Sequence, residues 1–142
     1  MLFIEQPVLR EMIADVEPCE DECCGFFFGH DEAKHRTITK SMAVNNSKEG
    51  DKQVNFEITL RDYLEAERIA EQENLSLLGV YHSHPNHSAI PSEYDRAAAQ
   101  PYFSYVIISV SNKKFAGIRS WQLDNHSQFK EEKIGYIQSS TH

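Results

Sequence analysis

Two histidines separated by one residue, His82 and His84, form with Asp95 the group of side chains with the clearest chemical meaning in this sequence. Imidazole nitrogens and a carboxylate oxygen are ligands that Zn²⁺ favours. Residues i and i+2 of an extended chain point to the same face, so both imidazoles can reach one ion. Three protein ligands leave one tetrahedral position open, which is typical of a catalytic zinc. The pattern therefore predicts a zinc hydrolase.

Ser92 and Asp95 also have a structural interpretation. Ser92-x-x-Asp95 has the spacing of a capping box, in which the serine caps a helix and the aspartate stabilises its first turn. The two roles are compatible, because the start of a helix beside a metal favours developing negative charge. We expect Glu93 to be a solvated acid of this turn. We expect His87, between the ligands, to be exposed and not to bind the metal.

Segments with a regular hydrophobic pattern must position these residues. Helices are predicted over residues 7–16, 59–73 and 92–100, with Thr59 able to cap the second. Strands are predicted over residues 25–29, 37–44, 54–58, 75–81, 102–110 and 115–123, the last two as a hairpin. The mixture indicates an α/β or α+β fold with the metal site at the end of the 75–81 strand.

Composition limits the possible partners and location. The 142 residues suit one domain. A net charge of −8, from 14 basic and 22 acidic residues, argues against binding to nucleic acid. No apolar run approaches the roughly 18 residues of a membrane span, and the N-terminal residues lack the pattern of a signal peptide. We therefore expect a cytoplasmic protein without a membrane partner.

Three cysteines, Cys19, Cys23 and Cys24, lie within six residues. An odd count with two adjacent cysteines does not make a disulfide framework, and no second pair completes a structural zinc site. We expect reduced thiols, at least one of them buried. We expect Cys24 to pack behind the site and Cys23 to lie closer to it.

A hydrolase of this kind also needs a group that moves protons. Four acidic residues precede the predicted strand at 25–29, namely Glu17, Glu20, Asp21 and Glu22. By composition alone they form a solvated acidic turn. The local pattern does not select one of them.

These segments together resemble the JAMM (MPN+) metalloproteases, the JAB-domain family. The motif His82-Ser83-His84-Pro85, followed after six residues by Ser92-x-x-Asp95, has that family's full spacing. Upstream, Pro18-x-x-x-Glu22-x-Cys24-Gly25 resembles the segment with its catalytic glutamate. The likeness covers roughly residues 7–123. It implies a single MPN/JAB domain over residues 1–124, with a mixed curved sheet flanked by helices, and a polar C-terminal tail over residues 125–142 of open role.

The resemblance also implies roles for the site residues. His82, His84 and Asp95 would bind Zn²⁺, with water in the fourth position. Glu22 would act as the general base, and Ser92 would stabilise the oxyanion of the substrate.

Other features bear on the base and the substrate. Glu20 stays a rival for the base, although the Glu-x-Cys-Gly spacing favours Glu22.

Residues 96–103 leave little room for the insertions of ubiquitin-specific members. The chain therefore looks most like bacterial peptidases that act on ubiquitin-like sulfur carriers. The implied reaction is hydrolysis of the amide bond after a carrier's C-terminal Gly-Gly, with this tail bound extended along a sheet edge. The alternatives are a general zinc peptidase for small peptides and, less favoured, a non-catalytic MPN scaffold. The oligomeric state is left open.

Overall fold

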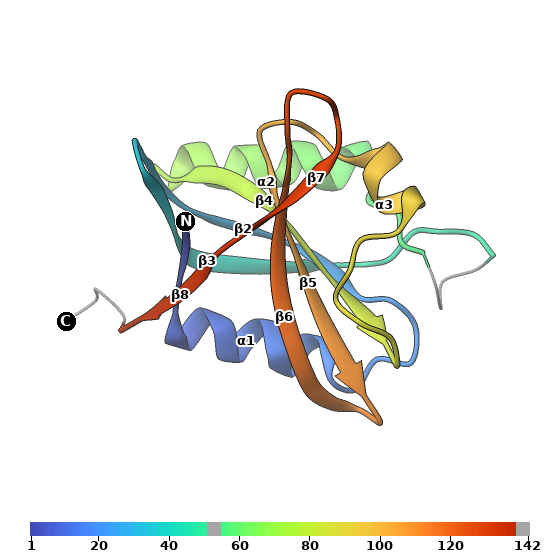
Figure 1. The fold of residues 1–142 in the computed structure, drawn as a ribbon. Helices are drawn as coiled ribbons and strands as arrows, with labels where there is room; N and C mark the ends of the chain where they lie inside the picture. The colour runs from blue at the N-terminus through green and yellow to red at the C-terminus, as the bar shows by residue number, and fades with distance from the viewer. Residues whose placement is uncertain (51–54, 139–142) are drawn as a thin grey trace.

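A mixed sheet of eight strands with a helix on either face makes up most of the described chain (Figure 1). The computed structural model describes residues 1–50 and 55–138. In chain order the elements are β1 (Leu2–Glu5), α1 (Gln6–Val16), β2 (Cys24–Glu32), β3 (His35–Val44), α2 (Leu60–Gln72), β4 (Ser76–Pro85), α3 (Glu93–Ala98), β5 (Ser104–Ser111), β6 (Lys114–Leu123), β7 (Phe129–Glu132) and β8 (Ile134–Ile137). None of the described helices is long and apolar enough to cross a membrane.

Strand β4 lies inside the sheet, whose order is β7-β6-β5-β4-β2-β3-β1-β8. It pairs antiparallel with β2 and parallel with β5, so His82 lies between Cys24 and Ile107. A strand with neighbours on both sides and helices over both faces requires apolar residues, and residues 77–81 have the sequence Leu-Leu-Gly-Val-Tyr. The backbone is therefore fixed on both sides up to the first histidine.

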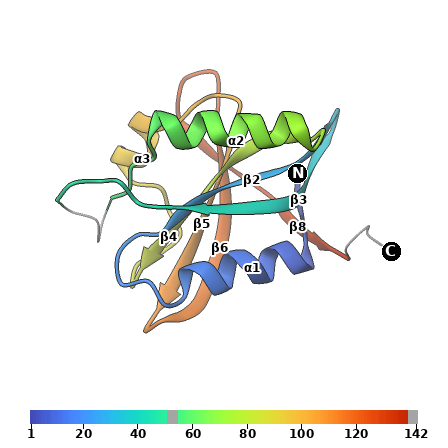
Figure 2. The ribbon, with the colours of Figure 1, turned by 180° about the vertical axis from the view of Figure 1, so that it is seen from behind.

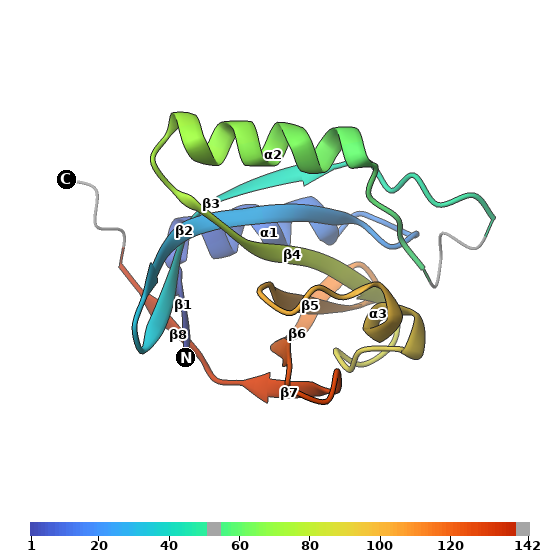
Figure 3. The same cartoon turned by 90° about the horizontal axis from the view of Figure 1, so that it is seen from above.

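Alternating residues of the strands supply two hydrophobic cores. The core under α1 includes Met12 and Phe27. The core under α2 includes Ala66, Phe26 and Val80. Figures 2 and 3 show the two helices on opposite sides of the curved sheet. The predicted fold class, a mixed curved sheet flanked by helices, is confirmed.

The C-terminal region completes the sheet. Strand β7 pairs antiparallel with β6, and β8 pairs parallel with β1. The two strands lie at opposite edges of the sheet, yet Lys133 alone separates them in the sequence. The sheet therefore curls so far that its two edge strands, β7 and β8, follow one another directly in the chain (Figure 3). Residues 129–137 of the C-terminal tail thus fold back onto the domain, whereas residues 139–142 lie outside the described residues.

Most predicted elements are confirmed with shifted ends. The predicted hairpin is β5–β6, joined by Asn112 and Lys113, which have φ angles of 51° and 63°. Positive φ at both central residues is the geometry that a two-residue hairpin turn requires. The 75–81 strand continues to Pro85, so both histidines belong to β4 rather than following it.

The strand predicted over residues 54–58 is wrong in its described part. Residues 55–58 belong to no strand, and Val54 lies outside the described residues. The Asn46 side chain donates to the Asn55 carbonyl and accepts from the Glu57 N–H. Phe56 and Ile58 pack against the core under α2. The alternating pattern thus arises because one side of the 55–58 loop packs on the core while the Asn46 side chain holds its backbone.

The expectation of three reduced cysteines is also wrong, because Cys19 and Cys23 form a disulfide. The turn after α1 brings their Cα atoms to 6.4 Å, within the range that a disulfide spans. Cys24 is the free cysteine and is buried, as expected of at least one thiol. Burial, followed by the nearby charges of Asp15, Asp62 and Glu22, raises the pKa of the Cys24 thiol to about 12.

Thiol titration checks this arrangement. Because the Cys24 thiol is buried and its pKa is raised, the native protein should show no rapidly reacting thiol. Unfolding without reductant should expose one thiol per chain, and unfolding with reductant three. A Cys24→Ala variant should show none without reductant. Three thiols in the unreduced, unfolded wild type would contradict the disulfide.

Candidate metal centre

The C-terminal half of β4 carries two buried histidines on the face that α2 covers. Val80, His82 and His84 alternate along the strand and therefore share this face. The ring centroids of the two histidines lie 5.0 Å apart. Phe56 stacks on the His82 ring with a centroid distance of 4.4 Å and restricts its orientation. The strand thus brings both imidazoles to one point, as the i, i+2 spacing predicts.

Asp95 reaches the same point from the first turn of α3. The Ser92 hydroxyl accepts a hydrogen bond from the Asp95 N–H at 3.1 Å, and the Ser92 N–H donates to Asp95 Oδ2 at 2.9 Å. This reciprocal pair is the capping box that the sequence predicts. The same Oδ2 lies 3.4 Å from His82 Nε2 and 3.5 Å from His84 Nε2. The cap therefore aims the carboxylate at the histidines, so both interpretations of Asp95 fit one geometry.

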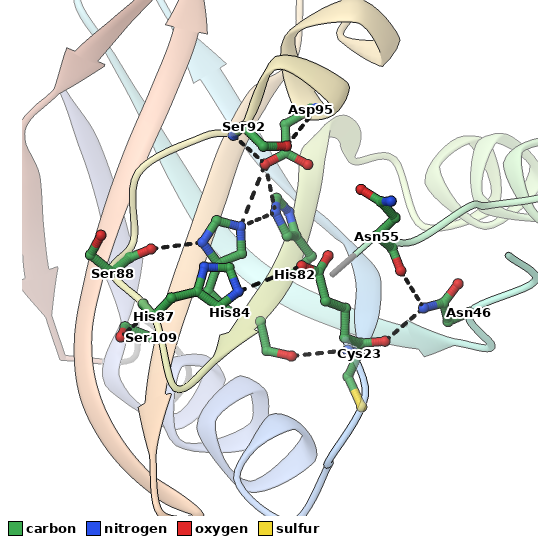
Figure 4. Close-up of polar contacts among 12 residues, drawn as sticks. Cys23, Asn46, Asn55, His82, His84, His87, Ser88, Ser92, Asp95 and Ser109 are labelled. Atoms are coloured by element: carbon green, nitrogen blue, oxygen red, sulfur yellow. Dashed lines mark hydrogen bonds and ion pairs between the residues drawn. The ribbon is translucent and has the colours of Figure 1, made fainter. Parts of the chain in front are cut away.

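Asp95 Oδ2 forms a nearly regular triangle with the Nε2 atoms of His82 and His84, because these two nitrogens lie 3.2 Å apart (Figure 4). Bonds of roughly 2.0–2.2 Å to a tetrahedral zinc separate neighbouring ligand atoms by roughly 3.3–3.6 Å. The spacing of these atoms fits such an ion without rearrangement. His82, His84 and Asp95 are thus a buried group able to hold a metal ion.

The protonation states also suit metal binding. His84 Nδ1 lies 2.7 Å from the Ser88 carbonyl oxygen and donates a hydrogen bond to it, which leaves Nε2 as the atom that can face a metal. Burial lowers the pKa of His82 and favours its neutral form. Burial alone would raise the pKa of Asp95, but its contacts with His82 and His84 outweigh burial and hold that pKa well below its usual range. The Asp95 carboxylate is therefore ionised, and a bound cation would take the place of the hydrogens that the two histidines share with it.

Glu22 is the acid of the predicted cluster that lies in the site. Its side chain is 1% exposed, whereas that of Glu20 is 78% exposed and pairs with Lys113. Asp21 is also exposed, and Glu17 accepts a hydrogen bond from the Phe115 N–H, away from the site. Burial, reinforced by the Asp95 charge, raises the pKa of Glu22 to about 8. A carboxyl group with such a pKa takes up and releases protons near neutral pH.

Two polar side chains that the sequence analysis missed hold the backbone around Glu22. The Cys23 N–H donates to the Ser83 hydroxyl, and the Ser83 N–H donates to the Cys23 carbonyl, both at 2.9 Å. The Asn46 amide donates to the carbonyls of Glu22 and Asn55 at 2.9 and 3.0 Å (Figure 4). Asn46 stands in a polar loop 24 residues from Glu22, and no sequence pattern marks this contact.

His87 is exposed as expected, with 44% of its side chain accessible, and it lies against the site. Its ring stacks on that of His84 with a centroid distance of 4.1 Å, and its Nε2 is 3.9 Å from Glu22 Oε2. Ser109 and Trp121 fix this loop by donating to the carbonyls of His87 and Ala89. Whether His87 binds a metal stays a prediction.

A cavity of about 290 Å³ lies beside His82 and Asp95. Its apolar and aromatic walls come from the 55–58 loop, both neighbouring helices and the sheet, and include Phe56, Ile58, Tyr63, Val80, Tyr94 and Tyr105. A mostly apolar cavity with a few polar groups at one side is typical of a small binding site. The candidate metal centre therefore adjoins a space that can receive part of a ligand.

Comparison with known proteins adds independent information. Residues 5–124 match the model of a family described as prokaryotic homologs of the JAB domain. The chain is 32% identical over 133 residues to the desampylase of Pyrococcus furiosus, covering 94% of this chain and 89% of the relative. It is 30% identical over 126 residues to the desampylase of Haloferax volcanii, covering 88% and 84%.

Solved structures share the fold. The solution structure of protein DSY2949 from Desulfitobacterium hafniense has a TM-score of 0.83 and 26% identity, covering 97% of this chain and 94% of that one. The solution structure of a protein from Salinibacter ruber has a TM-score of 0.72 and 27% identity, covering 98% and 94%.

Replacing His84 by alanine should remove one corner of the ligand triangle. Because changes to partners that only support a ligand already weaken metal binding by about 10–100-fold, we expect His84→Ala to bind Zn²⁺ more than about 100-fold more weakly. Competition with a chromophoric chelator measures this change. The matched control is His126→Ala, an exposed histidine in a turn. Unchanged zinc affinity in His84→Ala would contradict the site.

Replacing Asn46 by alanine should destabilise the protein. The variant loses hydrogen bonds to the Glu22 and Asn55 carbonyls and from the Lys48 and Glu57 N–H groups. We expect the free energy of unfolding to fall by about 1–3 kcal/mol, measured by denaturant titration. The neighbouring exposed Asn45→Ala should change it little. Equal stabilities of the two variants would exclude this role for Asn46.

Proposed function

The chain belongs to the family of prokaryotic homologs of the JAB domain, and from this membership we propose that it is a zinc-dependent peptidase or isopeptidase. We propose further that it hydrolyses the amide bond after the C-terminal Gly-Gly of a ubiquitin-like sulfur-carrier protein. The observation that supports this most strongly is the buried triangle of His82, His84 and Asp95 beside the buried carboxyl group of Glu22.

Zn²⁺ is the metal that best fits two imidazoles and one carboxylate at tetrahedral spacing. When bound, zinc supplies a Lewis acid that lowers the pKa of water and polarises the scissile carbonyl. Proton transfer and stabilisation of the oxyanion are carried out by the side chains around it.

Glu22 is the general base in this proposal. It takes a proton from the attacking water and returns it to the nitrogen of the leaving amine. Its burial suits this role, because a carboxyl group away from bulk water keeps the proton within the site between the two transfers. The backbone contacts with Ser83 and Asn46 hold Glu22 in place.

Ser92 stabilises the negative charge that develops on the substrate oxygen. Its hydroxyl oxygen accepts from the Asp95 N–H, which leaves the hydroxyl hydrogen available for donation. The cap of α3 therefore fixes the position of Ser92 without using its donor. A hydroxyl at the first turn of a helix also lies where negative charge is favoured.

The substrate class is supported by three features. Both curated relatives are desampylases, which favours the tail of a ubiquitin-like protein as the substrate. Residues 96–103 run from Asp95 to β5 without an insertion. Loop 55–58 borders the cavity at His82 and Asp95, where a Gly-Gly segment can approach closely because it lacks side chains.

Intact-mass analysis tests the proposed reaction. Gly-Gly-tailed carriers extended by an amino acid or peptide are incubated with zinc-loaded protein, with a chelator control. A loss of mass equal to the residues after Gly-Gly, abolished by the chelator, is the expected result. Intact carrier adducts alongside cleavage of short peptides would favour a small-peptide peptidase. Intact adducts and intact peptides despite bound zinc would contradict the catalytic proposal.

Glu22→Gln should separate catalysis from metal binding. The amide keeps the shape of the side chain but cannot accept the proton, so we expect kcat to fall by at least about 100-fold while the zinc ion at His82, His84 and Asp95 stays bound. Metal analysis of the same sample provides the second measurement. The matched control is Glu20→Gln, since Glu20 is exposed and pairs with Lys113. Full activity of Glu22→Gln would show that Glu22 is not the base.

A further inference from the structure

A second group of metal-binding side chains lies next to the first among the described residues. Three possible ligand atoms, one from each of Glu22, His84 and His87, lie within 4.8 Å of one another. Both nitrogens of His84 are already engaged, Nε2 in the triangle with His82 and Asp95 and Nδ1 with the Ser88 carbonyl. The two side chains free to bind another ion are therefore Glu22 and His87.

Glu22 has the environment of a ligand without its cation. Its side chain is 1% exposed, and among the described residues no hydrogen-bond donor reaches either carboxylate oxygen. Unpaired buried carboxylates are costly, and such a group usually has a cation or donors beside it. The nearest nitrogen of an ionisable side chain is His87 Nε2, at 3.9 Å.

The separation between Glu22 and His87 is compatible with one bound ion. Two atoms bound to the same zinc lie roughly 3.3 Å apart at tetrahedral angles and at most about 4.2 Å apart. The observed 3.9 Å lies within this limit. The His87 ring is 44% exposed, so it can approach Glu22 further, and the exposed side gives an ion in solution a route of entry.

We propose that Glu22 and His87 form a second, weaker cation site that takes Zn²⁺ or a similar transition-metal ion once the triangle of His82, His84 and Asp95 is filled. Two protein ligands, completed by water, bind less tightly than three. Imidazole and carboxylate select transition metals over Ca²⁺ and Mg²⁺, which prefer all-oxygen sites. The second site is thus distinct in both ligands and affinity.

Occupation of this site has a functional consequence that rests on the proposed role of Glu22. A carboxylate bound to a cation cannot accept a proton from water. Excess zinc should therefore inhibit the hydrolase by removing its base while the first site stays intact. The half-exposed His87 then makes the enzyme sensitive to the level of free zinc, although it is not one of the three proposed ligands of the first site.

Zinc binding is measured first, without any assay of activity. Protein is dialysed against buffers of rising free Zn²⁺, and bound zinc is counted by mass spectrometry. Wild type and the exposed-histidine control His126→Ala should rise from one to two zinc ions per chain. His87→Ala and Glu22→Gln should each bind the first ion normally and the second at least about tenfold more weakly. A second ion that binds equally to wild type and His87→Ala would overturn the proposal.

Inhibition by zinc is then measured with the carrier-adduct assay. The activity of each protein is divided by its own activity at one zinc ion per chain. Wild type should lose activity over the range in which the second ion binds. His87→Ala should keep its activity over that range. Parallel inhibition of both proteins would overturn the regulatory consequence. Absence of cleavage in every sample would count against the proposed function alone, because the binding measurement stands independently of turnover.

Discussion

Two carboxyl groups are buried beside two buried imidazoles at the end of a central strand, and this concentration of unbalanced charge is the constraint on which the site depends. Asp95 is compensated within the protein by the Ser92 N–H and by contacts with both histidines. Within the part of the chain that the structure describes, no hydrogen-bond donor reaches the Glu22 carboxylate, and burial and the Asp95 charge raise its pKa to about 8. A cation at the triangle relieves both costs at once, since it is attracted to either carboxylate.

The fold keeps this charged group in place by connecting its parts to rigid elements. His82 and His84 lie on a strand with a parallel neighbour along its whole C-terminal half. Ser83, between them, is bonded through both its N–H and its hydroxyl to the backbone of Cys23, next to the proposed base. The Cys19–Cys23 disulfide closes the turn that carries Glu22. The proposed ligands and the proposed base thus share one local framework, which preserves their relative positions better than separate loops would.

The sequence predicts the features that neighbouring residues determine. It does not predict contacts between side chains that only the fold brings together. The His-x-His spacing and the Ser92-x-x-Asp95 cap follow from short-range geometry, and both were predictable. The alternating residues of 55–58 predict a strand, but the Asn46 side chain takes the place of a partner strand there. The disulfide depended on the turn after α1, and the position of His87 on anchoring of its loop by β5 and β6. The contacts of Asn46 and of the His87 loop have no sequence period, and the disulfide depends on the geometry of a single turn.

Asp95 connects metal binding to the formation of α3. The same Oδ2 accepts the capping hydrogen bond from the Ser92 N–H and faces both histidines. A helix of six residues is too short to be stable alone, since isolated helices need about 12–15 residues. A cation that fixes the Asp95 carboxylate therefore also favours the first turn of α3, and by linkage the folded turn strengthens binding of the cation. Tyr94 and Ala98 of this helix line the cavity beside the proposed ligands, so a bound cation would also stabilise one wall of the space proposed for the substrate.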